Sequence, residues 1–486
     1  MTDPSFTFEQ LAASAGIRTD GKSRPVVCVQ GLGFVGAAMS VAVSEAADPQ
    51  GNPRFNVVGI DLPGPRGERV IRSLNEGKFP AETDDANLVA ATSRAYRRGN
   101  LVATADAEAF RLASVVIVDI NLDLGPTSAD GEPFVDFSGL RAAIRTFATR
   151  ISPDCLVLVE TTVPPGTCAH VVAPEIRACF AERGLDPDSF LLAHSYERVM
   201  PGNQYLSSIT NFWRVFAGYN EAAARKCEEF LLTVVNAEDF PMSRMDTITA
   251  SETAKVLENS YRATNIAFIE EWGRFAESVG VDLFQVLDAI RMRPTHNNIR
   301  QPGFGVGGYC LTKDPLFARF SATTIFKRPE LDFPFSRRAV AVNNQMPLVS
   351  VGRLTGMFGG DLRGRKVLLL GVSYRPDVGD TRYSASEIFA RALVEAGASV
   401  VYHDPLVHDW PEMNAVVLQK LPPASGFDAI VLAVAHREYR DFDFASWIGE
   451  NRPKILDTNN VLSRAQIESL VARQHEVKSI GRGSPS

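Results

Sequence analysis

The sequence predicts an α/β protein with two doubly wound domains, joined by a long central helix and a small helical domain. Short runs rich in Val and Ile alternate with helical patterns in the first third of the chain. The middle contains neither Pro nor Gly over residues 246–272, and a second series of apolar runs begins after about residue 360. Because 486 residues exceed one ordinary core, we assign three domains to residues 1–240, 241–350 and 351–486.

The N-terminal domain is expected to contain a parallel sheet. Its apolar runs do not alternate with polar residues, as is typical of strands buried on both faces. The predicted strands cover residues 25–30, 56–60, 114–120 and 155–160, and two more at 190–195 and 213–218 extend the sheet. Helical spacing over residues 34–47 and 137–150 completes the βαβ order of a Rossmann-like domain.

The central and C-terminal parts follow a different pattern. Residues 246–280 predict one helix of about 50 Å, and residues 281–292 predict a second helix. The first helix is longer than a linker needs, so we expect it to form a homodimer interface. The C-terminal Rossmann-like domain is expected to have strands at 366–374, 398–405, 427–435 and 453–460, with a helix at 384–397.

Composition excludes several classes of protein. A net charge of -7 gives no electrostatic reason to bind nucleic acid. The N-terminal segment lacks the features of a secretory signal, and no apolar run approaches the ~18 residues of a membrane span. The six cysteines form no CxxC pair, which indicates reduced thiols and no metal site. We therefore expect a cytoplasmic protein that binds neither nucleic acid nor membranes.

A glycine-rich turn follows the first predicted strand. Gly31, Gly33 and Gly36 stand in the order G-x-G-x-x-G, directly before a predicted helix. The first glycine permits the turn, the second admits a pyrophosphate, and the third lets the helix pack on the strand. Phe34 and Val35 occupy the start of the helix, whose N-terminus faces the phosphates. This context favours dinucleotide binding over a purely structural turn.

Asp61 ends the second predicted strand, 30 residues after Gly31, with an insertion before the strand. A carboxylate at this position accepts a hydrogen bond from a ribose 2′-hydroxyl and repels a 2′-phosphate, so NAD is the expected cofactor. Arg66 lies nearby and could instead accommodate the 2′-phosphate of NADP. The alternative for Asp61 is a solvated carboxylate at a strand end.

The segment PGFGVGGYCLTKDP, residues 302–315, carries the strongest chemical signal. Its glycines let a substrate approach backbone N–H groups, and Cys310 is followed by Lys313. A thiol beside a cation and an oxyanion-binding backbone can attack an aldehyde. The alternative is a buried, inert cysteine on a turn.

Two further segments carry polar groups that could act in catalysis or have only a structural role. Lys255 and Asn259 stand four residues apart on the long helix and could stabilise an oxyanion and orient a water, or lie on a solvated face. The hydroxyls of ETTVPPGT, residues 160–167, could hold a water near the nicotinamide or cap a helix.

Together these segments resemble the UDP-glucose/GDP-mannose dehydrogenase family. The resemblance rests on GLGFVG (31–36), TTVPPGT (161–167), YERVMPGN (196–203), ETAKVLENSYRATNIAFIEE (252–271), GFGVGGYCLTKDP (303–315) and GVSYRPDVGDTR (371–382). Their order and separations cover nearly the whole chain. The resemblance implies an N-terminal NAD domain, a central helix that dimerises, and a C-terminal nucleotide-binding domain.

The resemblance also implies roles for individual residues. Cys310 is the nucleophile that traps an aldehyde as a thiohemiacetal, which a second NAD oxidises to a thioester. The other implied catalytic residues are Lys255, Asn259, Asp314, Glu197 and Thr162. Arg382 is implied to reach the cofactor, as is Thr162. The implied substrate contacts are Glu197, Arg198, Lys255, Asn259, Gly307, Tyr309, Tyr374 and Arg375.

Two segments resemble the branch of the family that acts on UDP-N-acetylhexosamines. ERVMPG, residues 197–202, has the ERxxPG form, and PGFGVGGYC resembles PGxGVGGHC with Tyr309 in place of the histidine. The expected reaction is the four-electron oxidation of C6 of a sugar such as UDP-GlcNAc or UDP-ManNAc to the uronate. UDP-glucose and GDP-mannose are alternative substrates.

The chain departs from the family pattern at three places: VDINLDLGP (118–126), Tyr383 and DTNN (457–460). The first two bear on cofactor geometry and the third on sugar recognition. Two rival functions are a single-step hydroxyacid dehydrogenase, which would need neither Cys310 nor residues 360–465, and a non-catalytic nucleotide-sugar binder. Two NADH per sugar would distinguish the expected reaction from both rivals.

Overall fold

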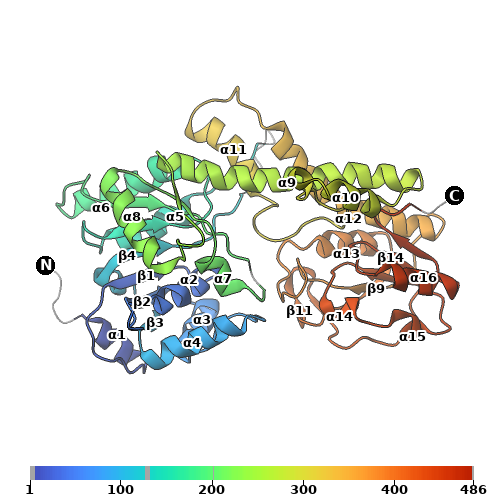
Figure 1. Cartoon of the computed structure of the whole chain (residues 1–486), viewed down its shortest axis with the longest axis horizontal. Helices are drawn as coiled ribbons and strands as arrows, with labels where there is room; N and C mark the ends of the chain where they lie inside the picture. The colour runs from blue at the N-terminus through green and yellow to red at the C-terminus, as the bar shows by residue number, and fades with distance from the viewer. Residues whose placement is uncertain (1–5, 126–131, 201, 484–486) are drawn as a thin grey trace. The chain divides into compact units, whose positions relative to one another are not determined.

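The computed structural model describes residues 6–125, 132–200 and 202–483 (Figure 1). Pro126 and Pro201, which belong to two of the segments discussed above, lie outside the described residues. The chain divides into two compact units, one over Met1–Leu257 with Phe317–Asp332 and the other over Glu258–Leu316 with Phe333–Ser486. The boundary falls inside helix α9 (Ile248–Ser278), so this helix contributes to both units.

The first unit is built on an eight-stranded sheet with the order β3-β2-β1-β4-β5-β6-β7-β8. Neighbouring strands are parallel except for β6 and β7. The strands are β1 (Val26–Gln30), β2 (Asn56–Ile60), β3 (Leu101–Thr104), β4 (Ala113–Val118), β5 (Leu156–Val159), β6 (Leu191–His194), β7 (Val215–Gly218) and β8 (Ser243–Arg244). The six strands expected from the sequence are present, and β3 and β8 are additional.

Helices cover both faces of this sheet. Along β1, Val26 and Cys28 belong to one apolar core, whereas Val27 and Val29 belong to the other. This alternation explains why the strand reads as a continuous apolar run. The helices are α1 (Phe8–Ser14), α2 (Phe34–Glu45), α3 (Pro65–Asn75), α4 (Ala86–Arg98), α5 (Ser138–Ala148), α6 (Ala173–Glu182), α7 (Tyr205–Thr210), α8 (Glu221–Val234) and α11 (Phe317–Phe320).

The strand order creates a topological switch point between β1 and β4. The chain proceeds from β1 outward through β2 and β3, and then returns to the other side of β1 with β4. Loops that leave β1 and β4 in opposite directions open a crevice at their carboxyl ends, where doubly wound sheets bind dinucleotides.

The second unit contains a five-stranded parallel sheet with the order β10-β9-β13-β14-β15. Its strands are β9 (Lys366–Leu370), β10 (Ser399–His403), β13 (Ala429–Leu432), β14 (Lys454–Asp457) and β15 (Val477–Ser479), and a separate pair comprises β11 (Asp409–Trp410) and β12 (Ala415–Val416). Its helices beyond α9 are α10 (Leu283–Arg291), α12 (Pro334–Met357), α13 (Ala385–Glu395), α14 (Arg437–Arg440), α15 (Phe444–Ile448) and α16 (Arg464–Ala472). The fold class predicted from the sequence is confirmed.

The long central helix is also confirmed, with 31 residues in α9. In the second unit, α9 packs through Ala263 and Ala267 against Ala339 and Val342 of α12. Helix α12 was not predicted from the sequence, and it continues through Pro347. Within the described ranges, no helix is both long and apolar enough to cross a membrane.

Candidate active site

The glycine-rich turn of the first unit forms a cradle at the switch point. Gly31 has a φ of +91° and donates its N–H to the Ile60 carbonyl oxygen at 2.8 Å. A Cβ on Gly31 would lie 2.4 Å from the Asp119 carbonyl oxygen, and one on Gly36 would lie 1.8 Å from the Gly31 carbonyl oxygen. Only glycine therefore fits either position. Gly33 is the N-cap of α2 and places no side chain over its first N–H groups. These features fit a pyrophosphate at the helix N-terminus.

Asp61 and Arg66 flank this cradle. The Asp61 carboxylate accepts hydrogen bonds from the Leu32 N–H at 3.0 Å and from the Leu62 N–H at 2.7 Å. A carboxylate can accept about four hydrogen bonds, so Asp61 keeps capacity for a ribose hydroxyl. Arg66 lies on α3, with Nη2 3.9 Å from the place that a Cβ on Gly33 would occupy. Its guanidinium is therefore positioned near the phosphate-binding turn.

We expect Asp61→Ser to lower the preference for NAD over NADP by on the order of 100-fold. The substitution removes both a charged acceptor for the ribose and the repulsion of a 2′-phosphate, each on the scale of ~1.5 kcal/mol. The ratio of kcat/KM for the two cofactors measures the effect. Arg66→Ala is the matched control, because it should lower activity with NADP without weakening the NAD preference. An unchanged ratio in Asp61→Ser would contradict the role of Asp61.

A group of acidic residues, of which Glu160 is completely buried, lies at the carboxyl ends of β4, β5 and β6. It consists of Asp119, Glu160 and Glu197, with Arg214 as its central cation. Arg214 donates to Glu160 Oε1 at 2.7 Å, and both side chains are buried. Burial raises the pKa of Glu160 to about 7, although the Arg214 charge opposes this shift. The sequence analysis assigned no role to Asp119, Glu160 or Arg214, which are far apart in sequence.

The segment TTVPPGT is held from both ends. The Thr161 hydroxyl accepts from the Ile120 N–H at 3.0 Å, while the Glu252 carboxylate of α9 accepts from the N–H groups of Gly166 at 2.5 Å and Cys168 at 2.7 Å. Burial raises the pKa of Glu252 to about 7. Glu252 therefore positions the loop that carries Thr162. The sequence analysis missed this role, although Glu252 stands one helical turn before Lys255.

Lys255 meets Glu197 within the first unit. Its Nζ donates to the Glu197 carbonyl oxygen at 2.8 Å, lies 3.8 Å from Glu197 Oε1, and lies 5.2 Å from the centre of the Tyr196 ring. Lys255 is only 7% exposed, so the alternative of a solvated helix face is wrong. Burial, followed by the Lys255 charge, lowers the pKa of nearby His194 to about 3, so this imidazole is neutral.

Arg198, an expected substrate contact, forms hydrogen bonds within the protein. Its guanidinium donates to the Trp213 carbonyl oxygen at 2.5 Å and to the Tyr196 hydroxyl at 3.1 Å. It also lies 5.6 Å from the centre of the Phe212 ring. Arg198 therefore fixes the segment after β6 that carries Glu197.

Asn259 and Asp314 meet within the second unit. Asn259 Nδ2 donates to Asp314 Oδ2 at 2.8 Å, and the Lys313 ammonium donates to Asp314 Oδ1 at 2.8 Å. Asp314 is completely buried and Asn259 is 1% exposed. Lys313 Nζ also lies 4.3 Å from the centre of the Tyr309 ring. The ammonium, carboxylate and amide thus form one buried chain at the end of the cysteine loop.

Cys310 is exposed, whereas the other five cysteines are buried. Its carbonyl oxygen accepts from the Asp314 N–H at 2.9 Å, which ties the backbone of Cys310 to the buried chain. Asn343 of α12 clamps the loop by donating to and accepting from Val306, both at 2.7 Å. The alternative of a buried thiol at Cys310 is therefore wrong.

The glycines of this loop lie against the segment after β9. A Cβ on Gly307 would lie 2.4 Å from the Tyr383 carbonyl oxygen, and one on Gly308 would lie 2.8 Å from the Tyr374 ring. Arg382 forms an ion pair with Asp380 at 2.9 Å. Burial, followed by the Asp380 charge, raises the pKa of Tyr374. The second unit therefore assembles Tyr309, Tyr374 and Tyr383 around the glycines before Cys310.

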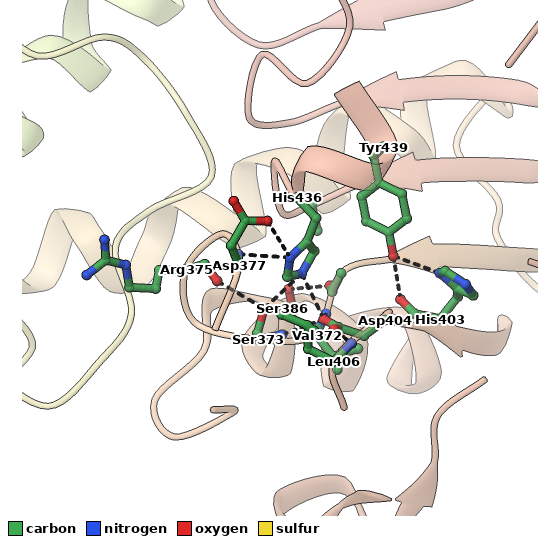
Figure 2. A network of polar contacts seen from close by, with 12 residues as sticks. Val372, Ser373, Arg375, Asp377, Ser386, His403, Asp404, Leu406, His436 and Tyr439 are labelled. Atoms are coloured by element: carbon green, nitrogen blue, oxygen red, sulfur yellow. Dashed lines mark hydrogen bonds and ion pairs between the residues drawn. The ribbon is translucent and has the colours of Figure 1, made fainter. Parts of the chain in front are cut away.

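Figure 2 shows the polar network that holds the segment carrying Tyr374 and Arg375. Asp404 accepts from the N–H groups of Val372 at 2.9 Å, Ser373 at 3.1 Å and Leu406 at 2.9 Å, and from His436 Nε2 at 3.1 Å. Ser373 Oγ in turn donates to the Arg375 carbonyl oxygen at 3.1 Å. This network fixes the backbone of the segment.

The grouping of Ser373, His436 and Asp404 is not a nucleophilic triad. Ser373 Oγ and Asp404 both approach Nε2 of His436, whereas a triad requires them on opposite ring nitrogens. Nδ1 instead accepts from the Asp377 N–H at 3.0 Å. The three residues have a structural role.

Within each unit, several of the expected site residues lie together. The first unit holds the dinucleotide cradle, Thr162, and Glu197 with Lys255. The second holds Cys310, Asp314 with Asn259, and the tyrosines beside the glycine loop. The DTNN turn lacks an arginine of its own, but Arg482 donates to Asn460 Oδ1 there at 2.9 Å.

Comparison with known proteins places three family models along the chain. They are the NAD binding domain (residues 26–234), central domain (249–345) and UDP binding domain (368–464) of the UDP-glucose/GDP-mannose dehydrogenase family. A UDP-N-acetyl-D-mannosamine dehydrogenase of Methanocaldococcus jannaschii is 30% identical over 451 residues, which are 90% of this chain and 93% of the relative.

Two solved structures are also similar. One is a UDP-D-ManNAc dehydrogenase from Pyrococcus horikoshii, with a TM-score of 0.78 and 26% identity, over 95% of this chain and 100% of that chain. The other is a UDP-glucose dehydrogenase from Pyrobaculum islandicum, with a TM-score of 0.76 and 25% identity, over 96% and 100% of the two chains.

Proposed function

Because the chain belongs to the UDP-glucose/GDP-mannose dehydrogenase family, and is therefore an NAD-binding enzyme, we propose that it oxidises C6 of a UDP-N-acetylhexosamine to the uronate. The observation that carries this proposal is the exposed Cys310 in a glycine loop backed by a buried Lys313–Asp314–Asn259 chain. A single-step alcohol oxidation needs no such thiol. We further propose that residues 1–240 bind NAD, that residues 241–350 provide catalysis and dimerisation, and that residues 351–486 bind UDP.

Cys310 supplies the covalent chemistry in this proposal. Its sulfur adds to the carbonyl carbon of the C6 aldehyde and forms a thiohemiacetal, whose oxidation gives a thioester. Water then attacks the thioester carbon, and the C–S bond breaks to release the uronate and restore the thiol. When bound at the glycine turn and Asp61, NAD would supply the hydride acceptor for the two oxidations. The exposure of the sulfur and the backbone fixed by Asn343 support this role.

Lys255 and Glu197 supply charge stabilisation and proton transfer. The Lys255 ammonium is desolvated, so its interaction with a developing alkoxide at C6 is stronger than it would be in water. The neighbouring Glu197 carboxylate can take the proton that water loses when it attacks the thioester. Thr162, held by the loop that Glu252 fixes, is proposed to hold this water. Asn259 and Asp314 position the cysteine loop.

The acetamido sugar is favoured over glucose by two observations. The sequence forms ERVMPG and PGFGVGGYC resemble the N-acetylhexosamine branch, and the relative with 30% identity acts on UDP-N-acetyl-D-mannosamine. The structural similarity to a UDP-glucose dehydrogenase keeps UDP-glucose as the second candidate.

A panel of UDP-ManNAc, UDP-GlcNAc, UDP-glucose and GDP-mannose tests the proposal. We expect one of the two acetamido sugars to have the highest kcat/KM and to yield two NADH per sugar. A pocket that hydrogen-bonds an acetamido group should disfavour UDP-glucose by about 1–3 kcal/mol, or roughly 5- to 150-fold. Higher activity on UDP-glucose would overturn the sugar assignment. One NADH per sugar would overturn the four-electron reaction.

We also propose a homodimer through α9. Its second half presents an aromatic stripe, formed by Tyr261, Phe268, Trp272 and Phe275, whose members are 48–55% exposed. Their spacing of three, four or seven residues follows one face of a helix. An apolar face of this kind on a monomer is unusual and indicates a protein partner.

Trp272→Glu should convert this dimer into a monomer, because burying a carboxylate among apolar rings is unfavourable. Light scattering coupled to size-exclusion chromatography measures the mass. Glu271→Lys changes the charge of an exposed neighbour outside the stripe, and should leave the dimer intact. A Trp272→Glu dimer of unchanged stability would place the interface elsewhere.

A further inference from the structure

Asp119 brings an unpaired carboxyl oxygen to the dinucleotide crevice. It directly follows β4, the strand beside β1 at the switch point. Its Oδ2 is buried and has no hydrogen-bond partner among the described residues. Its Cβ lies 3.1 Å from the place that a Cβ on Gly36 would occupy, so the side chain packs on the first turn of α2. This turn is where the pyrophosphate is expected to bind.

The charges that face Asp119 are mostly negative. Glu160 follows β5 and Glu197 follows β6, and the charges of both raise the pKa of Asp119, after the larger effect of burial. Arg214, just before β7, is the facing cation and lowers this pKa, but its guanidinium donates to Glu160 at 2.7 Å. From the other side, α2 contributes no charged side chain before Glu45.

We propose that Asp119 holds the dinucleotide as a neutral carboxylic acid, so that NAD binding is coupled to uptake of one proton. An ionised Asp119 would add negative charge beside the phosphates, next to two other carboxylates, and its buried Oδ2 would have no hydrogen bond to offset its desolvation. The neutral acid removes this repulsion, and its O–H can donate to an oxygen of the dinucleotide. The proton comes from solvent, and no bond of the cofactor changes.

This inference rests on the NAD-binding assignment and is independent of the sugar. Asp119 belongs to VDINLDLGP (118–126), one of the three places at which the chain departs from the family pattern. The linkage has a fixed sign. When binding requires a protonated group, the affinity for the dinucleotide does not change with pH below the pKa of that group in the free enzyme. Above that pKa, the affinity falls by up to about tenfold per pH unit.

The test measures binding of NADH to the full-length enzyme without sugar, by NADH fluorescence from about pH 5.5 to about pH 9. The wild-type Kd should rise by up to about tenfold per pH unit over its steepest part. In Asp119→Asn, which keeps the shape and a donor but cannot ionise, the Kd should vary less than about twofold. Calorimetry in two buffers of different ionisation enthalpy should show proton uptake by the wild type and none by the variant.

Two further variants separate Asp119 from its neighbours. Asp123→Asn makes the same change at an exposed position of the same segment, and should keep the wild-type profile. Glu160→Gln removes a facing negative charge, so the midpoint should move to lower pH while the dependence remains. Loss of the dependence in Glu160→Gln, with its retention in Asp119→Asn, would assign the proton to Glu160 and overturn the proposal. A flat wild-type profile, or proton release, would also overturn it.

Discussion

Cys310→Ser should lower uronate formation by on the order of 10³-fold or more. A serine hydroxyl is mostly protonated near neutral pH and is a far weaker nucleophile than a thiol, so the covalent step should nearly stop. The fold should persist, because Cys310 is exposed and the change replaces only sulfur by oxygen. Steady-state NADH production with the preferred UDP-sugar measures the loss.

The variant should retain the first oxidation if the thiol acts only after the aldehyde has formed. A single-turnover experiment should therefore yield at most one NADH per sugar, and mass spectrometry should detect no thioester. Unchanged NADH affinity and an unchanged melting temperature are the controls for folding. Turnover at the wild-type rate would rule out Cys310 as the nucleophile.

Asp314→Asn should lower the free energy of unfolding by about 3 kcal/mol. Asp314 is completely buried and neutralises the ammonium of Lys313, which is itself 6% exposed. The amide cannot neutralise this charge, and breaking a buried ion pair leaves an uncompensated cation in the interior. Its NH₂ group would also face either the Lys313 or the Asn259 donor. Urea-induced unfolding, followed by circular dichroism, measures the change.

Glu468→Gln is the matched control for this effect. It breaks the pair between Arg464 and Glu468, which has nearly the same geometry at 2.9 Å but lies on the surface of the same unit. An exposed helical pair of this kind contributes less than about 0.5 kcal/mol. Equal losses in the two variants would show that burial of Asp314 does not determine its contribution.

The sequence predicted the elements with strong local signals and missed those whose signal is weak. The strands of both sheets were visible because buried parallel strands are continuous apolar runs. Helix α12 was not visible, because Pro347 interrupts a pattern that tertiary packing nevertheless keeps helical. The strand β3 was not predicted, because it follows a helical segment closely and has only four residues.

The site residues also divide into those with a local sequence signal and those without one. Gly31, Gly36 and Cys310 were identifiable because their spacing or neighbours carry the chemistry. Glu252 was not, because a glutamate near the start of a helix usually interacts with water or the helix dipole. Its partners are loop N–H groups 84 and 86 residues away. The pair between Glu160 and Arg214 spans 54 residues, and no local pattern connects them.

The two sheets end their second strand in the same way, with a carboxylate that supports the turn after the first strand. In the first unit Asp61 accepts two hydrogen bonds, both from backbone N–H groups. In the second unit Asp404 accepts four, three from backbone N–H groups and one from His436. Since a carboxylate has about four acceptor sites, Asp404 is saturated and Asp61 is not. A ribose can therefore be recognised by this acid in only one of the two sheets. Two nucleotide sites of common architecture are thus chemically distinct, and a dinucleotide and a nucleoside diphosphate would not compete for them on equal terms.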